Sequence, residues 1–198
     1  MKNPYWHQYY KPHAIDFDEV RDLCFDAYSI ISASHAMAGL PGDEVGGTLH
    51  QYFWRTAEAR LSHCFLTIAV RMRTFEDMLS GEEKDKYDAI VAEHTGDGEL
   101  GSLGWSDRSE RVDLTFREAC NKIIHAEDFR PTYDNDSNDR DEDFAWGMNW
   151  IVELMGRLGK REWDVWLTAD EFLSSCLEVA NSVDPLPNDE DESAPVKE

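Results

Sequence analysis

Positively charged residues are scarce in this sequence of 198 residues. Lysine and arginine together number 19, against 41 aspartates and glutamates, which gives a formal net charge of −22. Affinity for nucleic acid comes mainly from clustered Lys and Arg side chains that neutralise phosphates, so this balance disfavours a broad nucleic-acid-binding surface. The excess of acid favours solubility and suits a positively charged partner.

Part of the acidic excess is concentrated in two segments. Residues 134–143 contain six acids and one arginine, and residues 184–198 contain six acids and one lysine, so each segment has a net charge of −5. The rest of the chain is still acidic, so any site for nucleic acid would need a local basic strip. We expect residues 183–198 to form a disordered acidic tail, because they offer little to bury.

The sequence also lacks paired cysteines, long apolar runs and histidine pairs at metal-binding spacing. Its four cysteines lie far apart in apolar patterns, which predicts reduced, mostly buried thiols in a cytoplasmic protein. No apolar run approaches the ~18 residues that a membrane span needs, and the N-terminus shows no signal pattern, so we expect no membrane contact. We expect neither a cofactor nor a bound metal.

Helical periodicity predicts a single domain over residues 15–182, preceded by an aromatic arm at residues 1–14. Asp16 and Glu19 resemble a capping box at the start of a helix that runs to about Ala38. Apolar residues then recur at helical spacing from 48 to 79, which predicts one long helix or two abutting helices. Four arginines lie on this segment, and we favour ion pairs with nearby acids over a basic strip that faces a ligand: Arg55, Arg60, Arg71 and Arg73.

Two segments of the middle region are predicted as loops. Residues 95–104 are rich in glycine but lack the Lys-Ser/Thr ending of a phosphate-binding loop, so we interpret them as flexible. Residues 132–143 are polar and acidic, and we predict that they form a solvent-exposed loop. The alternative is a calcium site, because Asp134, Asp136 and Asp139 offer oxygen ligands, although the glycine and glutamate of the usual calcium loop are missing.

The C-terminal third of the sequence changes period. Apolar and other residues alternate over 163–168, after a hairpin-like connection at 156–161, which predicts a β-hairpin over about 146–168, with a helix over 143–158 as the alternative. Thr168 and Glu171 have capping-box spacing and open a last helix that ends near Ser182. We therefore predict a mainly α fold: a helical bundle with long antiparallel helices, a small C-terminal hairpin and a final helix.

The most distinctive candidate site lies on a helix predicted from about Ser109 to Phe129. Arg117, Asn121 and His125 are spaced four apart, so they form a row along one helix face. Arginine supplies a fixed fork of donors for phosphate, and histidine titrates near neutral pH and can transfer a proton. A satisfied polar stripe without any catalytic role explains the same pattern equally well.

The segment Cys120-Asn-Lys-Ile-Ile-His-Ala126 resembles the catalytic helix of HEPN domains, which are small all-helical domains. Many are metal-independent ribonucleases of toxin–antitoxin and phage-defence systems. Asn121 and His125 match the polar residue and the histidine of the family motif, whereas Cys120 stands at the position of its arginine and Arg117 lies one turn earlier. The resemblance implies a homodimer with an RNA substrate, in which His125 is the acid or base, Arg117 binds phosphate and Asn121 orients the substrate.

The composition supports a second hypothesis from another class. A protein of the same fold without catalysis would be an inhibitor, an antitoxin or a nucleic-acid mimic, and its acidic surface would bind a basic protein partner. The two hypotheses differ in the residues that matter. Loss of His125 would abolish a ribonuclease activity, whereas the binding protein would depend on its surface carboxylates.

Overall fold

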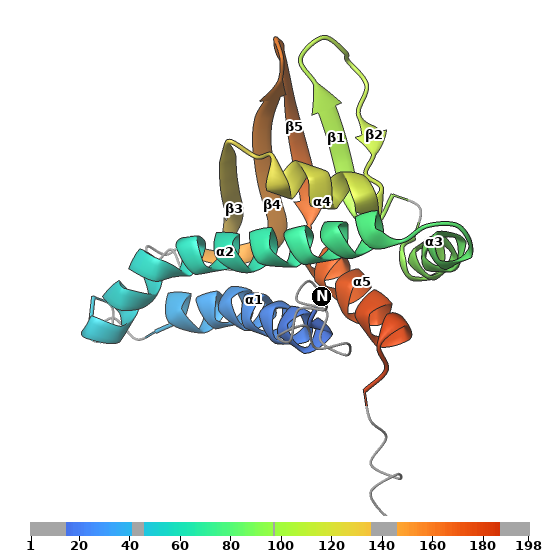
Figure 1. Ribbon diagram of the computed structural model, residues 1–198. Helices are drawn as coiled ribbons and strands as arrows, with labels where there is room; N and C mark the ends of the chain where they lie inside the picture. The colour runs from blue at the N-terminus through green and yellow to red at the C-terminus, as the bar shows by residue number, and fades with distance from the viewer. Residues whose placement is uncertain (1–14, 41–45, 97, 136–145, 187–198) are drawn as a thin grey trace, which may run out of the picture.

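The computed structural model describes residues 15–40, 46–96, 98–135 and 146–186, and over these ranges it has an α+β fold (Figure 1). Five helices pack against a five-stranded antiparallel sheet. The prediction of an all-α bundle with only a small hairpin is therefore wrong, because three strands were missed. The two long antiparallel helices of that prediction are present. The predicted arm and most of the acidic loop and tail lie outside the described residues.

The first two helices follow the sequence pattern closely. Helix α1 (Phe17–Ala38) begins where predicted, and the Asp16 carboxylate accepts hydrogen bonds from the backbone N–H groups of Asp18 and Glu19 at 3.0 and 3.3 Å. Helix α2 (Thr48–Met78) is one continuous helix of 31 residues and lies antiparallel beside α1 (Figure 1). Their apolar stripes face each other and the rest of the core.

The remaining helices are shorter. Helix α3 (Glu82–His94) follows α2 after a short connection. Helix α4 (Phe116–Ile124) is less than half as long as predicted, since strands take both of its predicted ends. Helix α5 (Ala169–Val183) matches the predicted last helix, but the side chain of Thr168 makes no capping hydrogen bond.

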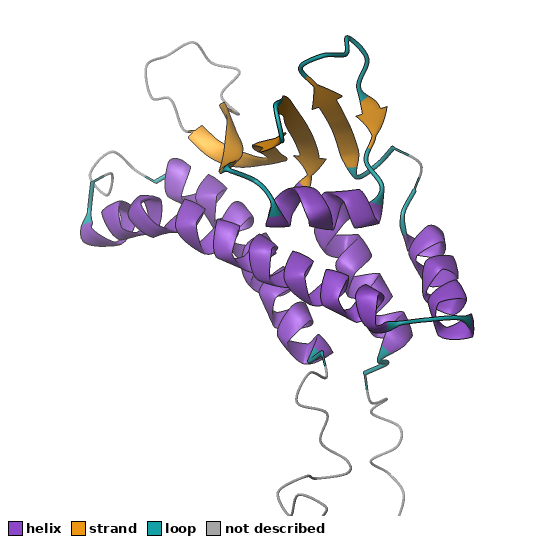
Figure 2. Ribbon diagram, turned by 45° about the horizontal axis from the view of Figure 1, so that its top comes forward, coloured by secondary structure: helices purple, strands orange, loops and turns teal. Residues whose placement is uncertain are grey.

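The sheet has the strand order β2-β1-β5-β4-β3, with all neighbours antiparallel. Figure 2 shows the helices gathered on one side of it. The predicted hairpin is confirmed as β4 and β5, and Gly159 in their turn has a positive φ of 65°. The strands are β1 (Gly101–Trp105), β2 (Val112–Asp113), β3 (Asp128–Asn135), β4 (Trp146–Leu158) and β5 (Arg161–Thr168).

Strand β1 lies where the sequence predicted a flexible glycine-rich loop. Gly101 has a φ of +114°, and a Cβ on it would lie 1.9 Å from the backbone oxygen of Trp166 on β5. A glycine is required here because the two backbones approach closely. At this position, the glycine that indicated a loop is therefore a consequence of strand packing.

Strand β3 replaces the predicted end of the central helix and the start of the acidic loop. Phe129, Pro131 and Tyr133 alternate along it and are buried or half-buried, whereas Arg130 and Asp134 are exposed. Proline is tolerated because β3 is an edge strand, whose outer N–H groups have no ladder partner. This period of two was missed because Pro131 indicates a break when it is considered locally.

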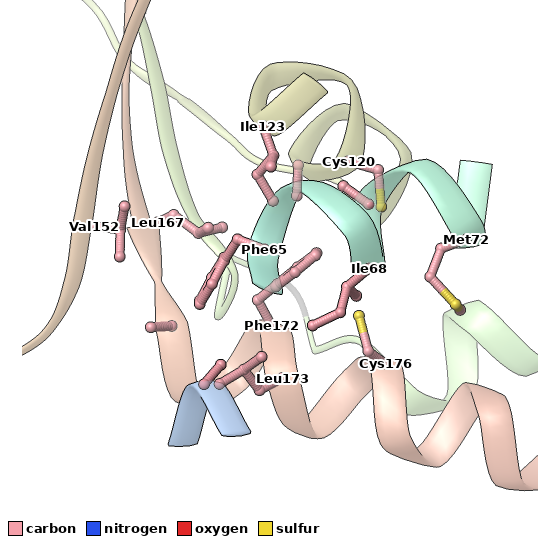
Figure 3. Packing of buried hydrophobic residues seen from close by; sticks show 14 of the residues in the cluster. Phe65, Ile68, Met72, Cys120, Ile123, Val152, Leu167, Phe172, Leu173 and Cys176 are labelled. Carbon is pink, nitrogen blue, oxygen red and sulfur yellow. The ribbon is translucent and has the colours of Figure 1, made fainter. Parts of the chain in front are cut away.

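The core joins both layers (Figure 3). The ring of Phe65 on α2 lies 5.6 Å from the ring of Phe172 on α5 and 5.6 Å from that of Phe129 on β3. Val152 and Leu167 contribute from the sheet and are fully buried. The sheet is therefore part of the main hydrophobic core and not an appendage.

All four cysteines are unpaired and buried, which confirms the prediction of reduced, buried thiols. Burial raises the pKa of the Cys120 thiol to about 12 and that of Cys64 to about 11. Among the described helices, none combines the length and the apolar character that crossing a lipid bilayer requires.

Candidate functional site

Helix α4 carries Arg117 and Asn121, and His125 is its C-cap residue. The local sequence of the helix explains its position. Thr115 and Glu118 form a capping box at its start. Its inward side is apolar and packs on α2, as Figure 3 shows for Cys120 and Ile123. The residue at the position of the family arginine, Cys120, is thus a core side chain and faces away from solvent.

Arg117 is engaged in ion pairs with α2. Its Nη1 contacts Oε1 of Glu76, and its Nη2 lies 3.4 Å from Oδ1 of Asp77. The hydrogen bond to Glu76 raises the pKa of Arg117 above its ordinary value. About half of the side chain remains exposed. The predicted phosphate ligand is therefore occupied by two carboxylates of its own chain.

Asn121 joins the same group of residues. Its Oδ1 accepts a hydrogen bond of 2.8 Å from Nε of Arg73 on α2. The Nη1 of Arg73 in turn lies 3.2 Å from Glu76 and 2.6 Å from Asp77. Asn121 thereby orients an arginine that neutralises two acids, which is a structural task.

Glu76 is the centre of this arrangement, and the sequence analysis missed it. It is only 6% exposed, yet three cations from α2, α3 and α4 lie around its carboxylate: Arg73, Lys84 and Arg117. A buried carboxylate needs such compensation, because desolvation of an unpaired charge is costly. Its signal in the sequence is its spacing: it lies four and eight residues after Met72 and Ile68 in the buried stripe of α2.

His125 is not part of this cluster. It is the C-cap of α4, where its backbone N–H donates to the carbonyl of Asn121 at 3.1 Å, and its side chain is exposed. Within the described ranges, no hydrogen bond or ion pair links its ring to Arg117 or Asn121. The structure thus brings two of the three predicted residues together and leaves the third at the helix end.

Two other arginines near α4 also have partners, and Lys122 on α4 lies over the Trp105 and Trp163 rings. Arg111 pairs with Asp164 and stacks over the Trp166 ring, and Arg130 pairs with Asp128. These contacts leave little free positive charge around α4 for a phosphate chain. On α2, the predicted ion pairing of the arginines is confirmed for Arg71, with Glu19, and for Arg73.

A large cleft lies at the end of the sheet near the β4–β5 hairpin. Its volume is about 760 Å³, and both of its arginines are paired: Arg157 with Glu127 at 3.0 Å and Arg130 with Asp128. Its acidic lining does not suit a phosphate group. The lining residues are Trp105, Ser106, Glu127, Asp128, Arg130, Met155, Gly156, Arg157, Glu162, Trp163 and Asp164.

Within the described ranges, no cluster of three or more His, Cys, Asp or Glu side chains is arranged to hold a metal ion. Of the calcium-loop candidates, Asp136 and Asp139 lie outside the described residues, and Asp134 is on β3. No family model matches this sequence, and comparisons with curated proteins and with solved structures also find no match. The functional argument therefore depends on the geometry of this chain.

Proposed function

We propose that this protein is a non-catalytic, intracellular binding protein whose acidic surface binds a basic protein partner. One observation carries the proposal. Most lysines and arginines of the described ranges form ion pairs with acids of the same chain, and the acids outnumber them. Nine lysines and arginines of the described ranges form ion pairs: Arg21, Arg71, Arg73, Lys84, Arg111, Arg117, Arg130, Arg157 and Arg161.

The outer side of α1 illustrates the surface that a basic partner would meet. Asp22 and Asp26 are exposed and have no ion-pair partner among the described residues, and Phe25 between them is 69% exposed. An exposed aromatic ring, flanked by carboxylates that form no ion pair within the described ranges, suits a partner that offers both positive charge and apolar surface. Electrostatic attraction of this kind raises association rates and weakens with salt.

Fluorescence anisotropy with two labelled probes tests the proposal. A twelve-residue oligolysine peptide and a twelve-nucleotide single-stranded RNA are titrated with the full chain at several salt concentrations. We expect saturable binding of the peptide that weakens with salt, and no binding of the RNA. Equal or tighter binding of the RNA would contradict the proposal.

A pair of double variants locates the surface. Asp22→Asn with Asp26→Asn removes unpaired carboxylates, whereas Asp107→Asn with Asp164→Asn removes the same charge from carboxylates paired with arginines. We expect the first double variant to weaken peptide binding more than the second. Equal effects would show that net charge alone attracts the peptide, without a contact surface on α1.

The ribonuclease hypothesis, with its HEPN resemblance and homodimer, stays a prediction. Arg117 and Asn121 are held by contacts with α2, and His125 lies apart from them. These contacts support the binding protein more than a nuclease, because a nuclease needs its phosphate ligand and its acid or base at one phosphate.

A further inference from the structure

An aromatic pocket lies between the first half of α2 and the edge of the sheet where β3 ends and β4 begins. Trp54 and Glu58 line it from α2, and Tyr133 and Trp146 line it from the sheet, around a volume of about 520 Å³. The Trp54 and Tyr133 ring centroids are 6.0 Å apart with their planes at 49°, so their faces are inclined to each other. Three aromatic rings and one carboxylate thus converge on a single space.

Glu58 carries the one formal charge among the four residues that line this pocket, and its side chain is exposed. The Tyr133 hydroxyl donates to Oε1 of Glu58, and Trp54 Nε1 donates to His50 Nε2 at 3.1 Å. Burial raises the pKa of Tyr133, as does the contact with Glu58, so the hydroxyl stays protonated. No Lys or Arg of the described ranges forms an ion pair with Glu58, in contrast to Glu76.

At other positions in this chain, tryptophan rings lie against positively charged side chains. The Lys122 ammonium lies 4.5 Å from the Trp105 ring centroid and 4.3 Å from that of Trp163, and the Arg111 guanidinium lies 4.7 Å from that of Trp166. In each case the negative ring face receives a cation of the chain itself. Within the described ranges, no such cation fills the pocket of Trp54, Tyr133 and Trp146.

We propose that this pocket binds the ammonium group of a lysine side chain from the basic partner, an inference that rests on the proposed function. The ring faces attract the cation, the apolar walls cover its methylene stem, and Glu58 accepts an N–H of the ammonium with its remaining lone pairs. The negative charge of Glu58 selects a cation over a neutral apolar side chain of the same shape.

The test compares two peptides that differ in one group. The full chain is titrated with capped Gly-Lys-Gly and with the same peptide carrying norleucine, which keeps the methylene stem without the ammonium. Binding is followed through the indole N–H signals in NMR spectra, with the five other tryptophans as internal controls. We expect the Trp54 and Trp146 signals to shift, with the lysine peptide binding about tenfold more tightly. Equal affinity of the two peptides would overturn the inference.

Matched variants test whether the NMR signal shifts report binding in this pocket. Trp146 is 51% exposed and Trp166 is 53% exposed, so replacing either with alanine should preserve the fold. We expect Trp146→Ala to weaken lysine-peptide binding at least about fivefold, and Trp166→Ala, whose ring already holds Arg111, to leave it unchanged. Glu58→Gln should remove most of the preference for lysine over norleucine. A loss with Trp166→Ala equal to that with Trp146→Ala would contradict the assignment.

The two proposals fail differently. If oligolysine binds wild type and Trp146→Ala equally well, the acidic surface is supported and the pocket is excluded as the lysine site. If the lysine tripeptide shifts the Trp54 signal but oligolysine does not bind more tightly than that tripeptide, the pocket recognises a free small cation and the proposal of a protein partner is wrong. A trimethyl-lysine tripeptide that binds while the lysine tripeptide does not would also contradict the assignment to an unmodified lysine.

Discussion

Arg73 on α2 and Asn121 on α4 are 48 positions apart in the sequence, and a hydrogen bond of 2.8 Å joins them. The contact fixes the Arg73 guanidinium where it also meets Glu76 and Asp77. Asn121, which the sequence analysis placed in a catalytic row, therefore serves the packing of one helix on another. The first two predictions below concern this charged cluster.

Replacing Glu76 with glutamine should destabilise the protein by about 2–4 kcal/mol, because three cations lose a buried counter-charge. Chemical denaturation followed by circular dichroism measures the free energy of unfolding. Asp77→Asn is the matched control, since Asp77 is exposed and shares two of the same arginines. We expect that change to cost less than about 1 kcal/mol. Similar losses for both variants would show that burial of Glu76 does not matter.

The same cluster predicts a dependence of stability on pH. The hydrogen bond from Arg73 lowers the pKa of Asp77 in the folded state. The unfolded chain therefore binds this proton more readily, and the stabilisation is present above the unfolded pKa of about 3.9 and lost as pH falls through the folded pKa. Unfolding curves measured between pH 6 and 2.5 should fall more steeply for wild type than for Asp77→Asn. Parallel curves would exclude this contribution.

The cysteines should be inert while the protein is folded. Burial raises the pKa of Cys120 to about 12, and it also raises the pKa of Cys176. The reactive thiolate is therefore scarce near neutral pH, and the side chains are covered. Ellman's reagent should modify none of the four thiols in native buffer and all four in denaturant. Rapid modification of the native protein would contradict the buried positions.

The exposed end of α4 separates the two functional hypotheses. We expect purified wild-type protein to leave a mixed RNA pool intact in the absence of metal, because His125 lies apart from Arg117 and Asn121. Gel analysis beside His125→Ala makes the comparison. Cleavage by wild type alone would restore the ribonuclease hypothesis and give His125 the role of acid or base.

Local signals in the sequence were sufficient for three of the five helices. Asp16 caps α1 where predicted, the stripe from Leu61 to Met72 is buried in α2, and α5 begins immediately after Thr168. Each of these elements buries one continuous face, so its period is visible without knowledge of its partners. The hairpin of β4 and β5 was also predicted from local signals, since its strands are adjacent in the sequence and joined by a short turn.

The missed strands depend on neighbours that are distant in the chain. Gly101 is glycine because Trp166 approaches it, and Pro131 is tolerated because β3 has a free edge. Both residues indicate a break when they are considered locally. The sequence analysis therefore assigned their segments to loops and extended the central helix over the start of β3. For this reason it predicted a helical bundle for a protein with an α+β fold.

The candidate site shows the same division. The row of Arg117, Asn121 and His125 was visible as a spacing, but spacing does not reveal what each side chain faces. Glu76 and the aromatic pocket were not predicted, since their members come from elements far apart in the chain.

The sequence by itself determined the acidic charge, the buried thiols and the helices that bury one continuous face, because these properties depend on composition or local period. Only the tertiary structure decided the sheet, the partners of Arg117 and the convergence of Trp54, Tyr133 and Trp146. Those features are pairings between distant segments, and a pairing is stabilised by the fold as a whole and not by either segment alone.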